Sequence, residues 1–268
     1  LSSLQDGKWN SKAYSVQFDG TGDELDFAGN SDFAFGTGDF TVEAWVYPDS
    51  HANYRTIIDT RSGSVGSGDG WIIGLDSAGA AYVYSSNFLT GAVGPLKAPI
   101  NTWTHIAYTR TGGTHRLFVN GSLSFSSTTA KDYTDNVLSI GAESYGGTTF
   151  KFVGKISNVR LVKGQSLYSS NFTPPGTALT TTSQGATASN VKLLCCQDNA
   201  VATTVVSPVT PTVVGDPTAS NTSPYLFDTN GYYGVNTGTS NTTKITIPHW
   251  AADTLYYYCN AHSGMGSS

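Results

Sequence analysis

Trp103–Gly121 reads W-T-H-I-A-Y-T-R-T-G-G-T-H-R-L-F-V-N-G, and this stretch decides the fold. Apolar and polar residues alternate in Trp103–Tyr108 and in His115–Val119, which places one row of side chains in a core and the other toward solvent. Between these runs, Gly112–Gly113 supplies the positive φ angles that a tight hairpin turn needs. A second turn signal, Asn120–Gly121, follows at once. The stretch therefore predicts three consecutive antiparallel strands with no room for a helix.

Composition limits the kind of protein. The chain has 268 residues, of which only 12% are charged, and its net charge is −5. No basic run is present, so the electrostatic footprint of a nucleic-acid-binding protein is missing. No apolar run is long enough to span a membrane. A surface whose polarity comes from Ser, Thr, Asn and Gly is typical of proteins that work outside cells, so we expect an extracellular or virion-surface location.

Strand signals recur about every ten residues, with turn signals between them, and helical periodicity is absent. In Phe40–Pro48 the alternation places an aliphatic row on one face and Thr41, Glu43, Trp45 and Tyr47 on the other. Such spacing indicates a sandwich or a barrel, and we expect a single all-β sandwich. We expect a lead-in at residues 1–13, the sandwich at 14–195, and a Thr/Pro-rich linker with a small β-rich assembly extension at 196–268.

Six segments occur in the order and spacing of a known family. They are Phe18–Gly20, Phe40–Val46, Trp103–Arg110, Leu117–Gly121, Ile140–Gly141 and Phe152–Leu161. They resemble the concanavalin A-like/laminin-G-like jelly-roll domain over most of residues 14–163. The resemblance implies a jelly-roll β-sandwich. Members bind glycans, bind protein partners or build particles, and the fold alone does not choose among these functions.

Later segments carry a narrower resemblance. Gln165–Pro175 and Val191–Cys196 are similar to the variant of this domain seen in marine bacteriophage structural proteins. Leu255–Gly266 is similar to a segment of such phage proteins and resembles a cupredoxin ending. This resemblance implies a part of a virion, such as a fibre, tail or decoration subunit.

An enzymatic function is not expected. Glycoside hydrolases of this fold use a pair of carboxylates, carried by a Glu-x-Asp-x-x-Glu signature or a close variant of it. Here Glu24-Leu-Asp26-Phe-Ala-Gly lacks the third carboxylate, and Glu43 has no acidic residue two or four positions away. No nucleophile elbow of the Ser-His-Asp type is present either. We therefore predict no catalytic residue.

Two metal sites are candidates. Asp19, Asp23 and the region of Asn158 offer the hard oxygen ligands that calcium prefers. The competing interpretation is that Asp19 only caps the turn next to Gly20. No cofactor is predicted firmly, and calcium is a possible one.

Copper is the second metal considered. Cys259-x-x-His262-x-x-Met265 has the ligand types and spacing of a copper site. A second histidine, expected earlier in the unit, is absent between Cys195 and Pro248. We interpret the motif as a relic.

Aromatic residues carry the binding hypothesis. Exposed rings stack on sugar faces, and Asn, Ser, Asp and Arg side chains hydrogen-bond to hydroxyl groups. The competing interpretation is that about half of the aromatic residues belong to the core. The candidates are Trp45, Tyr47, Tyr54, Trp71, Tyr82, Tyr84 and Tyr145. We predict that Tyr54, Arg55, Arg61 and Tyr145, which are expected in loops, bind carbohydrate.

These observations favour a non-enzymatic extracellular or virion structural protein. Residues 196–268 are expected to mediate self-association or docking on other virion or fibre subunits, because small apolar β units with unpaired edges seek partners. The alternative is a glycan-binding adhesin module that recognises cell-surface carbohydrate. Neither nucleic acid nor a membrane is an expected partner.

Overall fold

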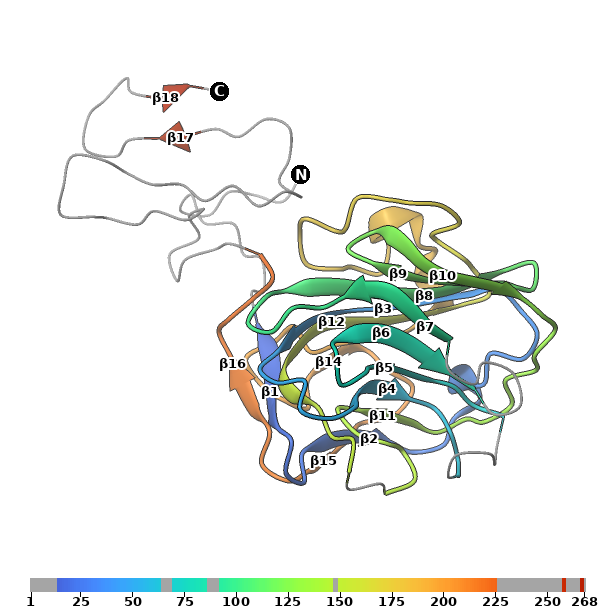
Figure 1. The fold of residues 1–268 in the computed structure, drawn as a ribbon, viewed down its shortest axis with the longest axis horizontal. Helices are drawn as coiled ribbons and strands as arrows, with labels where there is room; N and C mark the ends of the chain where they lie inside the picture. The colour runs from blue at the N-terminus through green and yellow to red at the C-terminus, as the bar shows by residue number, and fades with distance from the viewer. Residues whose placement is uncertain are drawn as a thin grey trace.

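A computed structural model describes the protein over residues 14–63, 69–85, 92–146, 149–225, 257–258 and 266–267 (Figure 1). Within these ranges the helices are three short 3-10 turns, η1 (Ser31–Phe33), η2 (Ser183–Gly185) and η3 (Ala188–Asn190). The strands are β1 (Ser15–Asp19), β2 (Glu24–Phe27), β3 (Phe40–Pro48), β4 (Arg55–Asp59), β5 (Ile72–Leu75), β6 (Ala80–Tyr84), β7 (Ala92–Lys97), β8 (Thr104–Thr111), β9 (Thr114–Val119), β10 (Ser122–Thr128), β11 (Leu138–Ile140), β12 (Val153–Lys163), β13 (Val191–Cys195), β14 (Thr204–Val206), β15 (Thr212–Val214), β16 (Thr218–Ser220), β17 (Tyr257–Tyr258) and β18 (Gly266–Ser267).

Two antiparallel sheets stack face to face and form a jelly-roll sandwich (Figure 1). Sheet A has nine strands, in the order β10-β9-β8-β3-β12-β1-β16, with β13 paired to β12 and β14 paired to β13. Sheet B has seven strands, in the order β15-β2-β11-β4-β5-β6-β7. The all-β prediction is confirmed.

The β8–β9–β10 ribbon is built as the opening stretch predicts. Gly112 and Gly113 join β8 to β9 with φ angles of 53° and 78°, and Asn120 and Gly121 join β9 to β10 at 47° and 73°. Two consecutive positive φ angles match the right-handed twist of a two-residue hairpin. Thr111 accordingly pairs directly with Thr114.

The core lies between the sheets and follows the predicted alternation. Phe40, Val42, Ala44 and Val46 of β3 point into it, as do Ile73 and Leu75 of β5 and Ala81 and Val83 of β6. Trp71 is also a core residue, and its ring stacks on that of Phe35 with 5.8 Å between centroids. Trp71 is therefore scaffold and not a binding residue.

The outer face of sheet A is covered as well. Segment 164–190, gold in Figure 1, lies across it, and Thr109 Oγ1 donates a hydrogen bond of 2.9 Å to the carbonyl of Tyr168. Trp45 is buried there, with its ring 6.1 Å from that of Tyr225. This segment closes the face of sheet A that would otherwise meet solvent.

A buried ionic network fastens this covering segment. Arg160 donates to Glu43 Oε1 from Nε at 2.9 Å and from Nη2 at 2.5 Å, while His105 and the Tyr168 hydroxyl bond to Oε2 at 3.1 and 2.9 Å. Burial alone would raise the pKa of Glu43, but the bond from His105 and the charge of Arg160 outweigh it and lower the pKa. His105 thus has a buried acidic partner that is 62 residues away in the sequence.

Strands beyond residue 195 complete both sheets. β14 pairs with β13, β15 pairs with β2 at the edge of sheet B, and β16 pairs with β1 at the edge of sheet A. The paired strands of the sandwich therefore continue past the predicted boundary at 195/196, as far as β16. Of the predicted extension after residue 225, only the β17–β18 pair lies within the described residues.

Replacing the guanidinium of Arg160 tests the network. Arg160→Met leaves the Glu43 carboxylate buried without its cation, and we expect it to lower the free energy of unfolding by about 3–5 kcal/mol. Lys192→Met is the matched control, because Lys192 and Asp32 form a partly exposed ion pair at 3.6 Å that contributes about 1 kcal/mol at most. Urea denaturation at pH 7 measures both, and equal losses would contradict the assignment.

A second buried group makes stability depend on pH. His115 Nδ1 lies 2.7 Å from the hydroxyl of Tyr108, which in turn lies 2.9 Å from the hydroxyl of Tyr133. Burial, together with the charge of Arg110, lowers the pKa of His115 to about 4. The imidazole is therefore neutral in the folded protein at pH 5–6, whereas in the unfolded chain it binds a proton there.

We expect the free energy of unfolding to fall as pH drops from 7 to about 4, because only the unfolded chain takes up this proton in that window. The contribution of His115 is at most about 3 kcal/mol. His115→Gln should remove that part of the loss, while His51→Gln serves as the control for deleting a histidine. Denaturant titrations at pH 7 and pH 4.5 measure the difference, which should vanish if His115 titrates normally.

Candidate functional site

The outer face of sheet B carries a row of polar and aromatic side chains. Because Ile73, Ala81 and Val83 point into the core, their neighbours along β5 and β6 point outward. The pairing aligns one such row across six strands. The row is Thr212, Asp26, Ser139, Asp59, Ile72 and Tyr84.

Tyrosines from three segments gather on this face. Tyr82 and Tyr84 are two residues apart on β6, and the ring of Tyr54 lies 5.6 Å from that of Tyr82 and 5.7 Å from that of Phe150. Gly74 makes room for them, because a Cβ at this position would lie 2.6 Å from the Tyr82 hydroxyl. The absence of a side chain at Gly74 lets the Tyr82 ring lie flat across β5.

Arg61 anchors the adjoining loop. Its Nε donates to Asp59 Oδ1 at 2.9 Å, and its Nη2 donates to Asp59 Oδ2 at 2.7 Å and to Glu143 Oε1 at 3.0 Å. Ser144 donates its hydroxyl to the Arg61 carbonyl. Burial alone would lower the pKa of Arg61, but the bonds to both carboxylates outweigh it and raise the pKa.

Two rings flank this guanidinium. The Arg61 Cζ atom lies 5.6 Å from the centroid of Tyr84 and 5.2 Å from that of Tyr145. The Tyr145 hydroxyl donates to Glu143 Oε1 at 2.8 Å, and burial together with this bond raises the pKa of Tyr145 to about 12. The contacts fix both rings in place, so each presents a rigid and partly exposed surface.

A hollow of about 270 Å³ lies beside the loop, between β2, β11 and β15. Asp26 is its ionisable residue, and burial followed by the charge of Glu24 raises the pKa of this carboxyl, against the hydrogen bond from Ser139 and the charge of Lys151. Its lining residues are Asp26, Phe27, Ala28, Val137, Leu138, Ser144 and Thr212. The hollow thus combines a carboxyl and two hydroxyls with apolar walls.

The predicted carbohydrate residues are placed differently from one another. Tyr54 is 42% exposed, and Tyr145 is partly exposed on the same face. Arg55 is half-buried and donates to the carbonyls of Ser50 and Lys151. Arg61 lies in the loop after β4, as predicted, but it is only 1% exposed and its side chain bonds to Asp59 and Glu143. Its role in binding carbohydrate stays a prediction.

The sequence held signals for what was missed. Asp59 and Arg61 are two residues apart at the end of a strand, which places them on one face at ion-pair distance. Tyr82 and Tyr84, which were among the aromatic candidates, alternate with the core residues Ala81 and Val83 in the same way. The partner Glu143, 82 residues from Arg61, had no local signal.

Glu24 and Glu43, two of the acidic residues considered for catalysis, bond to other side chains, and so do Asp59 and Glu143. Glu24 Oε2 accepts a hydrogen bond of 2.9 Å from Lys151 Nζ, and Glu43 belongs to the buried network of sheet A. Asp59 and Glu143 share the guanidinium of Arg61. None of these four carboxylates is held free for acid–base chemistry.

A carboxylate cluster lies at the β1–β2 turn. One carboxylate oxygen each from Asp19, Asp23 and Asp216 lies within 4.8 Å of the others. Asp23 is buried and accepts hydrogen bonds of 2.9 Å from the backbone N–H groups of Asp19 and Asp216. Asp19 accepts one from the N–H of Thr21. Carboxylate oxygens of this kind suit calcium, and the remaining lone pairs are directed by the turn.

Asn158 is not part of this cluster. It is fully buried at a bulge of β12, where its Oδ1 accepts a hydrogen bond of 2.8 Å from Leu179 N and its Nδ2 donates to Ser157 Oγ. The prediction of Asn158 as a calcium ligand is wrong, because its side-chain amide is buried and hydrogen-bonds to Leu179 and Ser157. Asp216, 193 residues from Asp23, takes its place. The predicted copper residues Cys259, His262 and Met265 lie outside the described residues.

The sequence matches the family model of the concanavalin A-like lectin/glucanases superfamily, a laminin-G-type domain, over residues 19–166. The chain therefore belongs to this superfamily. No curated protein matches the sequence. In the part of the chain that is described, no helix has the length and apolar character needed to cross a membrane.

Two solved structures have a similar fold. A Bacteroides ovatus protein assigned to carbohydrate binding is 17% identical with a TM-score of 0.57, and the match covers 79% of this chain and 60% of that one. A heptameric pentraxin from Limulus polyphemus, similar to serum amyloid P, is 14% identical with a TM-score of 0.51, over 80% of this chain and 97% of that one. This chain thus spans about 60% of the length of the Bacteroides protein. At sequence identities of 17% and 14%, the similarity shows a shared fold and no more.

Proposed function

We propose that this protein is a non-catalytic, extracellular carbohydrate-binding module whose ligand lies on the outer face of sheet B. One observation carries the proposal: Tyr54, Tyr82, Tyr84 and Tyr145 gather on one face that the described chain leaves partly open. Tyrosine rings offer an apolar surface to the C–H face of a sugar and a hydroxyl at the edge. The hollow beside Ser144 and Asp26 adds hydrogen-bonding groups next to these rings.

Rigidity supports this function. Tyr84 and Tyr145 are held against Arg61, and Tyr54 is packed on Tyr82 and Phe150. A binding face that is already in place avoids the entropic cost of ordering side chains on association. The name of the Bacteroides ovatus relative, a carbohydrate binding protein, agrees with this proposal.

The carboxylates argue for binding without catalysis. Hydrolysis of a glycoside needs one carboxylic acid to protonate the leaving oxygen and a second carboxylate as nucleophile or base. On this face Asp59 and Glu143 both bond to Arg61, so neither carboxyl group is held ready to donate or accept a proton from a substrate. The expectation of a virion or fibre subunit stays a prediction, as does assembly through residues 196–268.

Removing one ring at a time tests the face. We expect a neutral or acidic oligosaccharide selected on a glycan array to bind the wild type, and Tyr54→Ala and Tyr84→Ala each to weaken it about tenfold, or ~1.4 kcal/mol. Calorimetric titration measures the affinities. Tyr47→Ala is the control, because Tyr47 packs on Trp103 and Lys155 at sheet A. Full affinity in both tyrosine variants, or no bound glycan at all, would exclude the proposal.

We also propose that Asp19, Asp23 and Asp216 bind calcium. Two of these carboxylates are exposed, and their mutual repulsion would be relieved by a divalent cation. Sites of extracellular modules have dissociation constants of roughly 10⁻⁴–10⁻³ M. Such a site would hold the β1–β2 turn to the β15–β16 turn.

Calcium should therefore stabilise the protein. With a dissociation constant near 1 mM, about 10 mM CaCl₂ should add ~1.4 kcal/mol to the free energy of unfolding after EGTA treatment. Asp216→Asn should abolish the gain, while Asp132→Asn, an exposed aspartate elsewhere, should keep it. A gain that is the same in both variants would place the calcium effect outside this cluster.

A further inference from the structure

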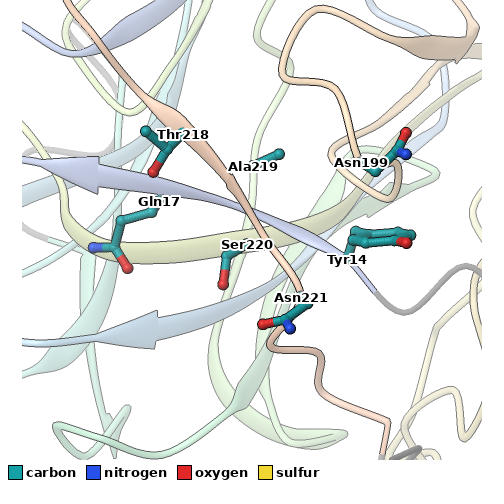
Figure 2. A pocket seen from close by; sticks show the side chains of 7 residues that line it. All are labelled: Tyr14, Gln17, Asn199, Thr218, Ala219, Ser220 and Asn221. Carbon is teal, nitrogen blue, oxygen red and sulfur yellow. The ribbon is translucent and has the colours of Figure 1, made fainter. Parts of the chain in front are cut away.

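A second hollow lies on the opposite sheet, at the β1–β16 edge of sheet A. Its volume is about 520 Å³, within the range of roughly 300–1,000 Å³ that small-molecule sites occupy. Figure 2 shows the Tyr14, Asn199 and Asn221 side chains at one end, and Gln17, Thr218 and Ser220 at the other. Ala219 completes the lining.

The strands explain why these side chains share one surface. β16 pairs with β1 so that Thr218 lies opposite Gln17 and Ser220 lies opposite Ser15. Paired residues of an antiparallel ladder point to the same side. Tyr14 precedes β1 and Asn221 follows β16, so in this antiparallel ladder both lie at the end next to the Ser15–Ser220 pair.

All of the lining residues lie outside the segment that matches the family model. The match covers residues 19–166, whereas the hollow is formed by two residues before it and by residues after 198. This surface is therefore added to the family fold by the strands that follow β13. It is separate from the tyrosine face of sheet B.

The lining chemistry points to one class of ligand. The residues are one aromatic ring, three side-chain amides, two hydroxyls and a methyl group, and none is charged at neutral pH. The lining offers no cationic side chain to an anion, no carboxylate to a metal ion and little apolar surface to a lipid. Amides offer paired donors and acceptors to vicinal hydroxyls, and the ring of Tyr14 offers an apolar surface.

The amides of Asn199 and Asn221 are also available. Both residues are exposed, and both side-chain amides line the hollow. Among the described residues, neither amide has a hydrogen-bond partner in the protein. We propose that the hollow is a second carbohydrate site, which takes an uncharged sugar residue of a polysaccharide. It extends the proposed function from one site to two, on different sheets, so that a long glycan or a glycan-coated surface would be held with avidity.

The experiment counts sites. The full chain is produced in a host that does not glycosylate, because Asn221-Thr-Ser is a glycosylation sequon. Maltotriose, laminaritriose and mannotriose are titrated by calorimetry into the wild type, Tyr14→Ala, the double variant Asn199→Ala/Asn221→Ala, and Tyr84→Ala. We expect two sites in the wild type for at least one of these probes, and one site in each variant. At the affected site, affinity should fall at least about fivefold.

The outcomes separate this inference from the proposed function. One site in the wild type, lost in Tyr84→Ala and kept in the Tyr14 and asparagine variants, overturns the second site and leaves the first intact. One site that is lost only in Tyr14→Ala and in the asparagine variant supports the hollow and overturns the sheet B face. Absence of binding by all three probes overturns the hollow.

Folding and self-association are controlled separately. The double asparagine variant changes two exposed residues and guards against a fold defect in Tyr14→Ala, with circular dichroism as the check. Light scattering reports the oligomeric state of every variant. Unchanged sugar binding combined with a changed oligomeric state would identify the β16 edge as a strand-pairing surface for a second copy, and would overturn the carbohydrate assignment.

Discussion

The carboxylate of Glu43 is the point on which the arrangement of sheet A depends. It accepts hydrogen bonds from Arg160, His105 and Tyr168, and Arg160 in turn donates to the carbonyls of Thr180 and Ser183. A buried charge without such partners costs several kcal/mol. Loss of the segment that covers sheet A would remove the hydrogen bonds of Tyr168, Thr180 and Ser183 to this ion pair. One face of the sandwich is closed by this network, and binding is left to the other sheet and to the edges.

Sheet B also has a buried arginine that is bonded to carboxylates. Arg61 bonds to Asp59 and Glu143, but the loop that this fastens is short and leaves the tyrosines partly open. The network of sheet A thus attaches the covering segment, whereas the network of sheet B holds the tyrosine rings that we propose to bind carbohydrate. Both are built from an arginine and carboxylates brought together by strand pairing, and their positions decide which surface a ligand can reach.

Local pattern was enough to predict the sandwich and its hairpins, because alternation and glycine pairs act over a few residues. The row Phe40 to Val46 and the turn at Gly112 are examples. The sites were harder, since their members meet through long-range pairing. Arg61 lies in a loop as expected but is buried against two carboxylates, and Asn158, expected near the β1 turn, lies in a bulge of β12. The strands β14 to β16 were taken for a linker because short Thr- and Val-rich runs with prolines carry no periodicity of their own.

The pairing of Ser15 with Ser220 has a mechanical consequence. The first and last strands of the sandwich are paired, so the chain begins and ends the sandwich at neighbouring points. Flanking segments could therefore extend from it without crossing the sandwich. Tension applied through both flanks would peel β16 from β1 one hydrogen bond at a time, instead of shearing the whole ladder at once. The hollow between Tyr14 and Asn221 lies at that point, where a molecule bound across the two strands would resist the peeling.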